Sequence, residues 1–84
     1  MRTQQISPSV NGYAVTPSDS ADIPIYSAKG WSVNADGTVV ILLQNMPSGA
    51  TPLEVAAKAG VRYPDIVRRF LSTGTSATGI NVYY

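Results

Sequence analysis

One stretch in the middle of the chain indicates the fold class most directly: Gly30-Trp31-Ser32-Val33-Asn34-Ala35-Asp36-Gly37-Thr38-Val39-Val40-Ile41-Leu42-Leu43. Its first part alternates, so that Trp31 and Val33 lie on one face of a strand. The Asp36-Gly37 step is a strong signal for a hairpin turn. Residues 38–43 are almost all β-branched or apolar, which is typical of a central strand covered on both faces. The stretch predicts a β-hairpin in a mainly β domain.

Shorter extended segments lie on both sides of this stretch. Residues 23–26 predict an edge strand, because Pro24 cannot donate a ladder hydrogen bond. Residues 65–72 predict a strand or a short helix. Residues 80–84 alternate and predict a closing strand, with Ile80, Val82 and Tyr84 on one face. Because a single loop separates these last two segments, we expect them to pair as an antiparallel hairpin.

One segment has a helical pattern. Thr51 can cap a helix, Pro52 fits its first turn and Glu54 completes a capping box. Helix-forming residues follow, and Gly60 is placed to end the helix. We expect one short helix of about two turns here, which needs to pack on the sheet because so short a helix is unstable alone.

The first 22 residues differ from the rest in being polar and rich in turn-forming residues. They fit either a flexible tail or an extended arm that orders on a neighbouring subunit, and a short strand at Gly12–Val15 is compatible with both. Isolated apolar residues favour the arm, because a pure linker has little use for them. The expected architecture is a small antiparallel β-sandwich or barrel-like domain at 23–84, with one short helix and an extended N-terminal arm at 1–22.

The chemistry-bearing residue types are scarce. The 84 residues include no Cys and no His, which excludes disulfides and thiolate zinc sites and removes the commonest general base. Of the five acidic residues, Asp36 is explained by its turn and Glu54 by its cap. No pair of carboxylates is marked out for acid–base work. We therefore expect no enzyme, no cofactor and no bound metal.

The charge content points to self-association. Only 13% of the residues are charged, against about 25% in an average domain. A net charge of +1 is too small to favour nucleic acid as a partner. The longest apolar run, residues 39–43, is far shorter than the roughly 20 residues of a membrane span, and the N-terminal residues show no signal peptide. A small chain without disulfides is marginally stable alone, so we expect a homo-oligomer.

Aromatic and neighbouring apolar residues are the candidates for the subunit interface, because aromatic side chains are enriched there. The candidates are Val10, Tyr13, Val15, Trp31, Tyr63, Arg68, Tyr83 and Tyr84. Two alternatives use the same side chains. Trp31 and the tyrosines could form a sugar-stacking platform of a small carbohydrate-binding module. Arg68 or Arg69 could contact nucleic acid, or could instead form a salt bridge or a subunit contact.

The loop at residues 73–79 has two interpretations. Glycine-rich loops can present backbone N–H groups to a phosphate. A phosphate-binding loop, however, opens a helix and usually carries a Lys, and neither feature follows here. We therefore expect a structural loop. Gly74 and Gly79 can adopt positive φ there, and the Thr75 hydroxyl can bond to the loop's own N–H groups.

A resemblance is carried by residues 64–80, which read Pro64-Asp65-Ile66-Val67-Arg68-Arg69-Phe70-Leu71-Ser72-Thr73-Gly74-Thr75-Ser76-Ala77-Thr78-Gly79-Ile80. The proline-containing strand with its basic residues, the Thr-Gly-Thr loop and the closing apolar strand resemble the small head-spike base proteins of gene transfer agents and related tailed phages. The resemblance extends over residues 22–84. Residues 52–62 depart from it as an insertion, where the helix is expected, and residues 1–21 are not covered.

The resemblance implies a non-enzymatic virion protein on the outer capsid surface, assembled in the host cytoplasm. Such a protein is either the base of a head spike or fibre, or a decoration (cement) protein that clamps capsomers. Its implied partners are further copies of itself, the major capsid protein and a spike or fibre protein. The homo-oligomer would be a pentamer at a five-fold vertex and a trimer at a three-fold position.

Overall fold

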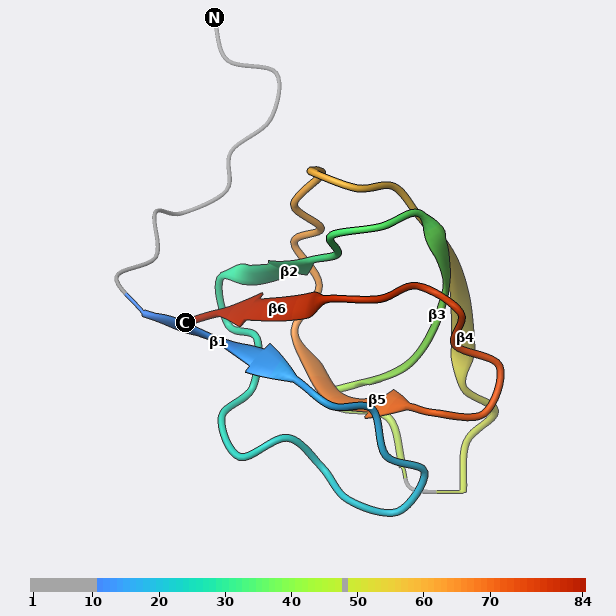
Figure 1. Cartoon of the computed structure of the whole chain (residues 1–84). Coiled ribbons are helices and arrows are strands. Elements are labelled where there is room, and N and C mark those ends of the chain that lie inside the picture. The colour runs from blue at the N-terminus through green and yellow to red at the C-terminus, as the bar shows by residue number, and fades with distance from the viewer. Residues whose placement is uncertain (1–10, 48) are drawn as a thin grey trace, which may run out of the picture.

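The protein consists of two small antiparallel sheets (Figure 1). The computed structural model describes residues 11–47 and 49–84, and this part of the chain contains strands but no helix. The first sheet has the strand order β1-β6-β2 and the second has the order β4-β3-β5. The mainly β fold class is thus confirmed. The strands are β1 (Gly12–Val15), β2 (Gly30–Ser32), β3 (Gly37–Leu43), β4 (Leu53–Ala57), β5 (Val67–Leu71) and β6 (Ile80–Tyr83).

Strand β3 occupies the centre of its sheet, as its two apolar faces predict. It pairs with β4 on one side, where Val39 lies opposite Val55, and with β5 on the other, where Ile41 lies opposite Phe70. Its middle residues are buried. Strand β3 is thus hydrogen-bonded along both edges and buried in its middle, as expected for the central strand of the second sheet.

The predicted hairpin of the central stretch is wrong. Strands β2 and β3 belong to different sheets, so residues 33–36 pass the chain from one sheet to the other, and Gly37 is already the first residue of β3. Asp36 does not close a hairpin: its Oδ1 accepts a hydrogen bond from the backbone N–H of Ala59 at 2.7 Å. An Asp-Gly step favours a tight turn only where the strands beside it pair with each other, and here β2 pairs with β6 while β3 pairs with β4 and β5.

The predicted short helix is also wrong, because residues 53–57 form strand β4. A two-turn helix is unstable on its own, whereas an extended segment here supplies the hydrogen-bonding partner that one edge of β3 needs. Val55 is partly buried and Ala57 is buried, while Glu54 and Ala56 are exposed. This alternation is the sequence signal that the capping pattern obscured.

The expected closing hairpin does not form either. Strand β5 pairs with β3, whereas β6 lies between β1 and β2 in the other sheet. The loop at 73–79 therefore connects the two sheets rather than two paired strands. Residues 23–26 are not a strand, and the place of an edge strand is taken by an irregular segment described below.

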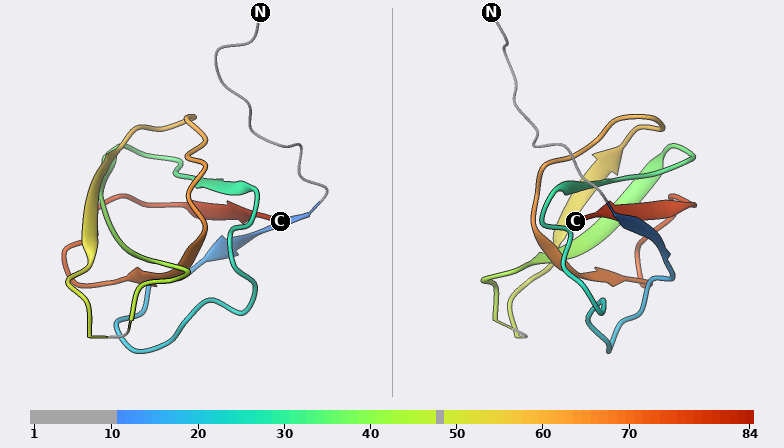
Figure 2. Two further views of the ribbon diagram at one scale, coloured as in Figure 1. Left: turned by 180° about the vertical axis from the view of Figure 1, so that it is seen from behind. Right: turned by 90° about the vertical axis from the view of Figure 1, so that its left-hand side faces the viewer.

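Part of the predicted arm belongs to the folded domain. Strand β1 pairs with β6 of the same chain, with Tyr13 opposite Val82. Asn11 and Tyr84 exchange two backbone hydrogen bonds of 3.2 and 2.9 Å. The start of β1 and the C-terminal residue consequently lie side by side at one edge of the molecule (Figures 1 and 2). Of the candidate residues, Val10 lies outside the described part.

The two sheets share one hydrophobic core. Trp31 on β2 is fully buried, stacks on Tyr63 at a ring-centroid distance of 4.6 Å and meets Phe70 of β5 edge to face at 5.6 Å. Ile80 and Val82 of β6 and Val39 and Ile41 of β3 are among the other members of this core. Trp31 thus joins the first sheet to the second.

Candidate functional site

An irregular segment, residues 18–27, covers the outer edge of β5, and we call it the strap. The backbone N–H of Ile23 donates to the carbonyl of Arg68 at 2.8 Å, and that of Ser27 donates to Val67 at 3.2 Å. In return, the buried Ser27 Oγ accepts the Val67 N–H at 2.8 Å. These bonds protect the edge of β5 from pairing with another chain.

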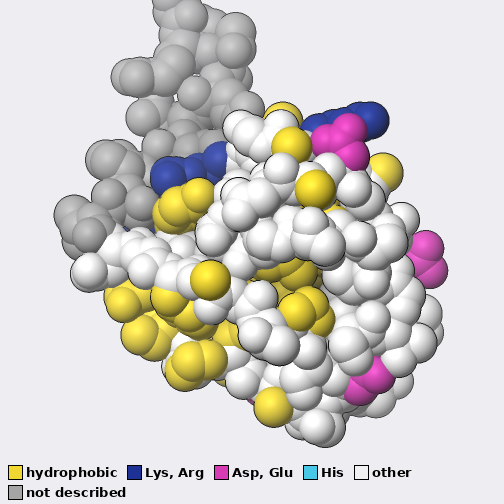
Figure 3. All heavy atoms as spheres, in the orientation of Figure 1, with side chains coloured by type: hydrophobic (Ala, Val, Ile, Leu, Met, Phe, Trp, Pro, Cys, Tyr) yellow, Lys and Arg dark blue, Asp and Glu magenta, His cyan; other side chains and the backbone are white. Residues whose placement is uncertain are grey.

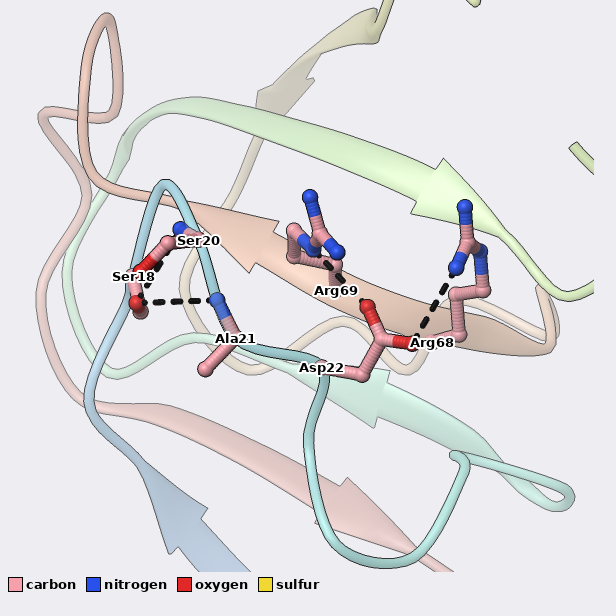
Figure 4. A network of polar contacts seen from close by, with 6 residues as sticks. All are labelled: Ser18, Ser20, Ala21, Asp22, Arg68 and Arg69. Atoms are coloured by element: carbon pink, nitrogen blue, oxygen red, sulfur yellow. Dashed lines mark hydrogen bonds and ion pairs between the residues drawn. The ribbon is translucent and has the colours of Figure 1, made fainter. Parts of the chain in front are cut away.

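Asp22 fastens the middle of the strap to two consecutive arginines (Figure 4). Its Oδ2 lies 3.1 Å from Arg68 Nη1, and its Oδ1 lies 2.8 Å from Arg69 Nε. Burial raises the pKa of Asp22, but the hydrogen bond from Arg69 and the charges of both arginines outweigh it, so the pKa lies below 3.8. Neighbouring side chains of a strand point to opposite faces, yet one carboxylate at the strand edge reaches both.

A second carboxylate fastens the beginning of the strap. Asp19 accepts the backbone N–H groups of Ser72 and Thr73, each at 2.9 Å, and the Thr73 hydroxyl at 2.5 Å. The Thr73 side-chain and backbone hydrogen bonds hold the pKa of Asp19 below 3.8. No sequence pattern indicates these partners of Asp19 and Asp22, because more than forty residues separate each aspartate from them.

The arginine pair is therefore part of the structure of the domain. The Arg68 and Arg69 side chains are mostly buried and both are bound to Asp22. The Asp22 carboxylate neutralises part of the positive charge that a phosphate would need. The nucleic-acid interpretation of Arg68 or Arg69 receives no support from this arrangement.

The loop at residues 73–79 interacts with β3 rather than with itself. Thr75 Oγ1 accepts the Val40 N–H at 3.0 Å and donates to the Leu71 carbonyl at 2.6 Å. Ser76 Oγ accepts the Thr38 N–H at 3.0 Å. The loop thus continues the ladder of β5 along β3 with side-chain oxygens in place of carbonyls.

The two glycines that bracket the loop have a left-handed backbone. The φ angle is +88° at Gly74 and +68° at Gly79. A Cβ at Gly79 would collide with the Asn34 side chain, and one at Gly74 would lie 3.0 Å from Val40 Cγ2. The loop geometry therefore requires glycine at both positions, most strictly at Gly79.

Several interface candidates serve the fold of the single chain. Trp31 is 0% exposed, so it offers no surface to a partner or a sugar. Tyr63 is half-buried against Trp31, and its hydroxyl accepts the Lys58 N–H at 2.8 Å. Tyr83 bonds to the Ser32 hydroxyl at 2.8 Å, and the Arg62 guanidinium lies 4.0 Å above its ring.

The remaining candidates lie closer to the surface. Tyr13 and Val15 are half-buried and pack against the core from β1. The Tyr13 ring meets that of Tyr84 at 5.9 Å, and the Tyr13 hydroxyl bonds to the backbone of Ile25. Tyr84 is half-buried and is one of the residues that line an open groove.

This apolar groove, of about 460 Å³, carries no charged side chain. Its lining residues are Pro24, Ile25, Tyr26, Ala28, Gln44, Ile66 and Tyr84. Ile25 is 44% exposed and Ile66 is 40% exposed, so two large aliphatic side chains are presented to solvent at one place. Hydrophobic side chains gather around the C-terminal end of β6 in Figure 3. Tyr84 is among the interface candidates predicted from the sequence, whereas no sequence pattern indicates Ile25 and Ile66, which lie far apart in the chain.

Metal ligands and membrane spans are absent from the described residues. Among residues 11–47 and 49–84, no group of three or more acidic side chains is placed to hold a metal ion. No helix long and apolar enough to cross a membrane occurs in the described part of the chain.

Comparison with solved structures shows similarity to a capsid protein chain. No protein-family model matches the chain, and no curated protein matches it. Among solved structures, a chain from the capsid of a native GTA (gene transfer agent) particle with C5 symmetry is similar, with a TM-score of 0.77. The two chains are 30% identical, and the match covers 93% of this chain and 86% of the other.

A match of this extent includes both sheets and the connections between them, and its sequence identity goes beyond a shared fold. The chain therefore belongs to the family of that GTA capsid chain and is a capsid-associated protein.

Proposed function

We propose that the chain is a non-enzymatic structural protein of the outer capsid surface, acting as the base of a head spike or fibre or as a decoration protein. The observation that carries the proposal is the match along 93% of the chain to a chain of a GTA capsid. The resemblance of residues 64–80 to head-spike base proteins supports the same role.

The character of the surface supports a structural role. Of the aspartates of the strap, Asp19 binds the backbone of β5's loop and Asp22 binds two arginines, so neither is held ready for catalysis. The apolar groove offers a contact of the kind that proteins use for one another, since exposed clustered apolar side chains mark interaction sites.

The partners proposed are further copies of this chain and the major capsid protein, with a spike or fibre protein as a third. The capsid position fixes the symmetry of the oligomer, because closed homo-oligomers match the axis on which they sit. A base at a vertex would be a pentamer and a cement protein at a three-fold position would be a trimer.

The burial of Trp31 argues against the alternative of a carbohydrate-binding module. A sugar-stacking platform needs an exposed aromatic face, and Trp31 is 0% exposed. Tyr63 is half-buried with its ring stacked on Trp31, and Tyr83 is half-buried beneath the Arg62 guanidinium.

The test is binding of the purified full-length chain to purified virus-like particles of its source. We expect the chain to sediment with the particles, and a reconstruction to place its density on the outer shell. Density at the five-fold vertices would support the spike base, and density at three-fold positions would support the decoration protein. Density inside the shell or in the tail, or no binding to particles, would contradict the proposal.

A further inference from the structure

Strand β4 is an edge strand whose outer side is left open by the described residues. The outer edge of β5 is bonded to the strap, and Trp31 of β2 exchanges two hydrogen bonds, of 2.8 and 2.7 Å, with Tyr63. Strand β1 faces the strap across a hollow of about 230 Å³. No backbone hydrogen bond joins the outer edge of β4 to any of residues 11–47 or 49–84, and Figures 1 and 2 show β4 at the periphery of the fold. An open sheet edge is a template for pairing with another strand.

The backbone groups on this open edge belong to Glu54 and Ala56. Along a strand, the N–H and C=O groups of successive residues point alternately to the two edges. The Val40 N–H bonds to the loop that follows β5, so the backbone groups of Val39 face β4 instead. Val39 lies opposite Val55, and the backbone groups of Val55 therefore face β3. It follows that the N–H and C=O groups of Glu54 and Ala56 point away from the sheet.

The side chains of β4 do little to block pairing. Glu54 and Ala56 are exposed, and Glu54 forms no ion pair with any residue that the structure describes. A proline, a bulge or a lysine within the strand would protect the edge, and Leu53–Ala57 contains none of these. Pro52 stands just before the strand and has no N–H, so it limits the pairable edge to the residues after it.

The sequence of β4 is complementary to a second copy of itself in one antiparallel register. With Val55 opposite Val55 of the second copy, each Glu54 lies opposite an Ala56, and every outward N–H and C=O of both strands has a partner. A register with Glu54 opposite Glu54 sets like charges against each other and brings Pro52 against Ala56. A shift the other way brings Lys58 against Glu54, but the Lys58 N–H is already bonded to a tyrosine hydroxyl of its own chain at 2.8 Å. Only the register centred on Val55 satisfies all of these groups.

We propose that β4 of one copy pairs antiparallel with β4 of a second copy, with Val55 at the centre of the contact. The two three-stranded sheets then join into one continuous sheet in the order β5-β3-β4-β4-β3-β5. The contact is two-fold, so it joins two copies only and is distinct from the head-to-tail contacts that close a pentamer or a trimer. The inference goes beyond the proposed capsid role and does not depend on it.

Single cysteines in the full-length chain test the register, because the chain has no cysteine of its own. Directly opposite residues of a non-hydrogen-bonded antiparallel pair have Cα atoms about 4.5 Å apart, within the range of a disulfide. Val55→Cys should therefore form a covalent dimer under oxidised glutathione, which is reduced to two glutathione molecules as the two thiols are oxidised. Leu53→Cys is the control: position 53 is more exposed than position 55 but lies opposite Ala57 of the second copy. We expect it to cross-link many-fold more slowly on non-reducing gels.

Two substitutions at the exposed Ala56 test which residue faces it. Ala56→Lys places an ammonium opposite Glu54 of the second copy, and Ala56→Glu places a carboxylate there. Because each dimer contains this pair twice, we expect Ala56→Lys to lower the apparent dissociation constant about tenfold and Ala56→Glu to raise it by a similar factor. Net charge alone predicts the reverse order, since Ala56→Glu brings the net charge from +1 to zero and Ala56→Lys raises it. Sedimentation equilibrium measures both constants, and circular dichroism shows whether each variant is folded.

Several results would overturn the inference. Equal cross-linking rates of Val55→Cys and Leu53→Cys would do so, as would a shift of both Ala56 variants in the same direction or a wild-type chain that stays monomeric at millimolar concentration. Variants at Ala56 that change only the binding to capsid particles would assign the edge to a strand of another protein and would equally overturn it. Particle binding by the wild type is measured separately, so a failure of the proposed function is distinguishable.

Discussion

Asp22 binds the two arginines of β5 simultaneously, so a single carboxylate attaches the strap at two points. Asp36, in contrast, contacts Lys58 at 3.7 Å with both side chains largely exposed. Ion pairs in water contribute little, whereas hydrogen bonds to partly buried charged groups contribute more. The two aspartates therefore form a matched pair for measuring what burial adds.

Replacing Asp22 by Asn should lower the free energy of unfolding by about 1–2 kcal/mol at neutral pH, because the amide can accept from one arginine only and presents its NH₂ to the other. Asp36→Asn, which keeps an oxygen for the Ala59 N–H, should cost under about 0.5 kcal/mol. Urea unfolding of the three proteins at pH 7 measures both effects. Equal losses for the two variants would contradict the assigned role of Asp22.

The effect of Asp22 should depend on pH in a defined direction. Since its pKa in the folded protein is lowered below 3.8, its contribution is complete above that value and is lost as pH falls through the folded pKa. The wild type and Asp22→Asn should therefore become equally stable in acid. Asp19, whose pKa is also lowered, should make the wild type lose stability over the same range. Unfolding curves between about pH 2 and pH 7 test this. A difference that persists undiminished at the acid end would argue against it.

Three glycines form a graded series at the residue scale. Gly49 has neither a positive φ nor a neighbour near a Cβ, Gly60 has φ of +81° without a neighbour, and Gly79 has both a positive φ and the Asn34 side chain in the way. Substitution by Ala should be nearly neutral at Gly49, cost about 1 kcal/mol at Gly60 and cost more at Gly79. Thermal unfolding of the three variants gives the order. A loss at Gly79 no greater than at Gly60 would mean that Asn34 moves away without cost.

At the scale of elements, β3 depends on the loop at 73–79 for part of its hydrogen bonding. Thr75→Val keeps the shape of the side chain but leaves the Val40 N–H and the Leu71 carbonyl without this partner. We expect a loss of about 1–3 kcal/mol and faster hydrogen exchange at the Val40 amide. Thr78→Val, in the same loop and exposed, is the control. Unchanged exchange at Val40 would show that water replaces the hydroxyl.

The two sheets of the whole molecule meet at Trp31, which contacts Phe70 of the other sheet. Trp31 is the only tryptophan in the chain, so its fluorescence reports on this junction. We expect fluorescence and far-ultraviolet circular dichroism to change together during unfolding, because neither sheet has a separate core. Phe70→Leu should lower the midpoint of both signals by the same amount, whereas Leu53→Ala, at an exposed position, should change it little. Separate transitions for the two signals would contradict a single cooperative unit.

Local patterns in the sequence were sufficient for several features. Alternation and β-branched residues predicted the extended segments around Trp31, residues 38–43 and residues 80–84, since side chains on a strand alternate whatever its partner is. Glycines in the loop at 73–79 predicted positive φ, which is a property of the residue itself. The low charge and the lack of Cys and His are properties of composition, so their indication of a structural role did not depend on how the chain folds.

Pairing was decided only by the tertiary structure. Three local patterns each involve only a few consecutive residues: the Asp36-Gly37 step, the capping pattern at 51–54 and the loop at 73–79. None of them specifies which distant strand completes a ladder. Residues 53–57 form a strand because their backbone groups bond to one edge of β3. Asp22 contacts Arg68 because the strap lies along the edge of β5. The groove shared by Ile25, Ile66 and Tyr84 arose the same way, from three segments brought together by backbone hydrogen bonds that no local pattern encodes.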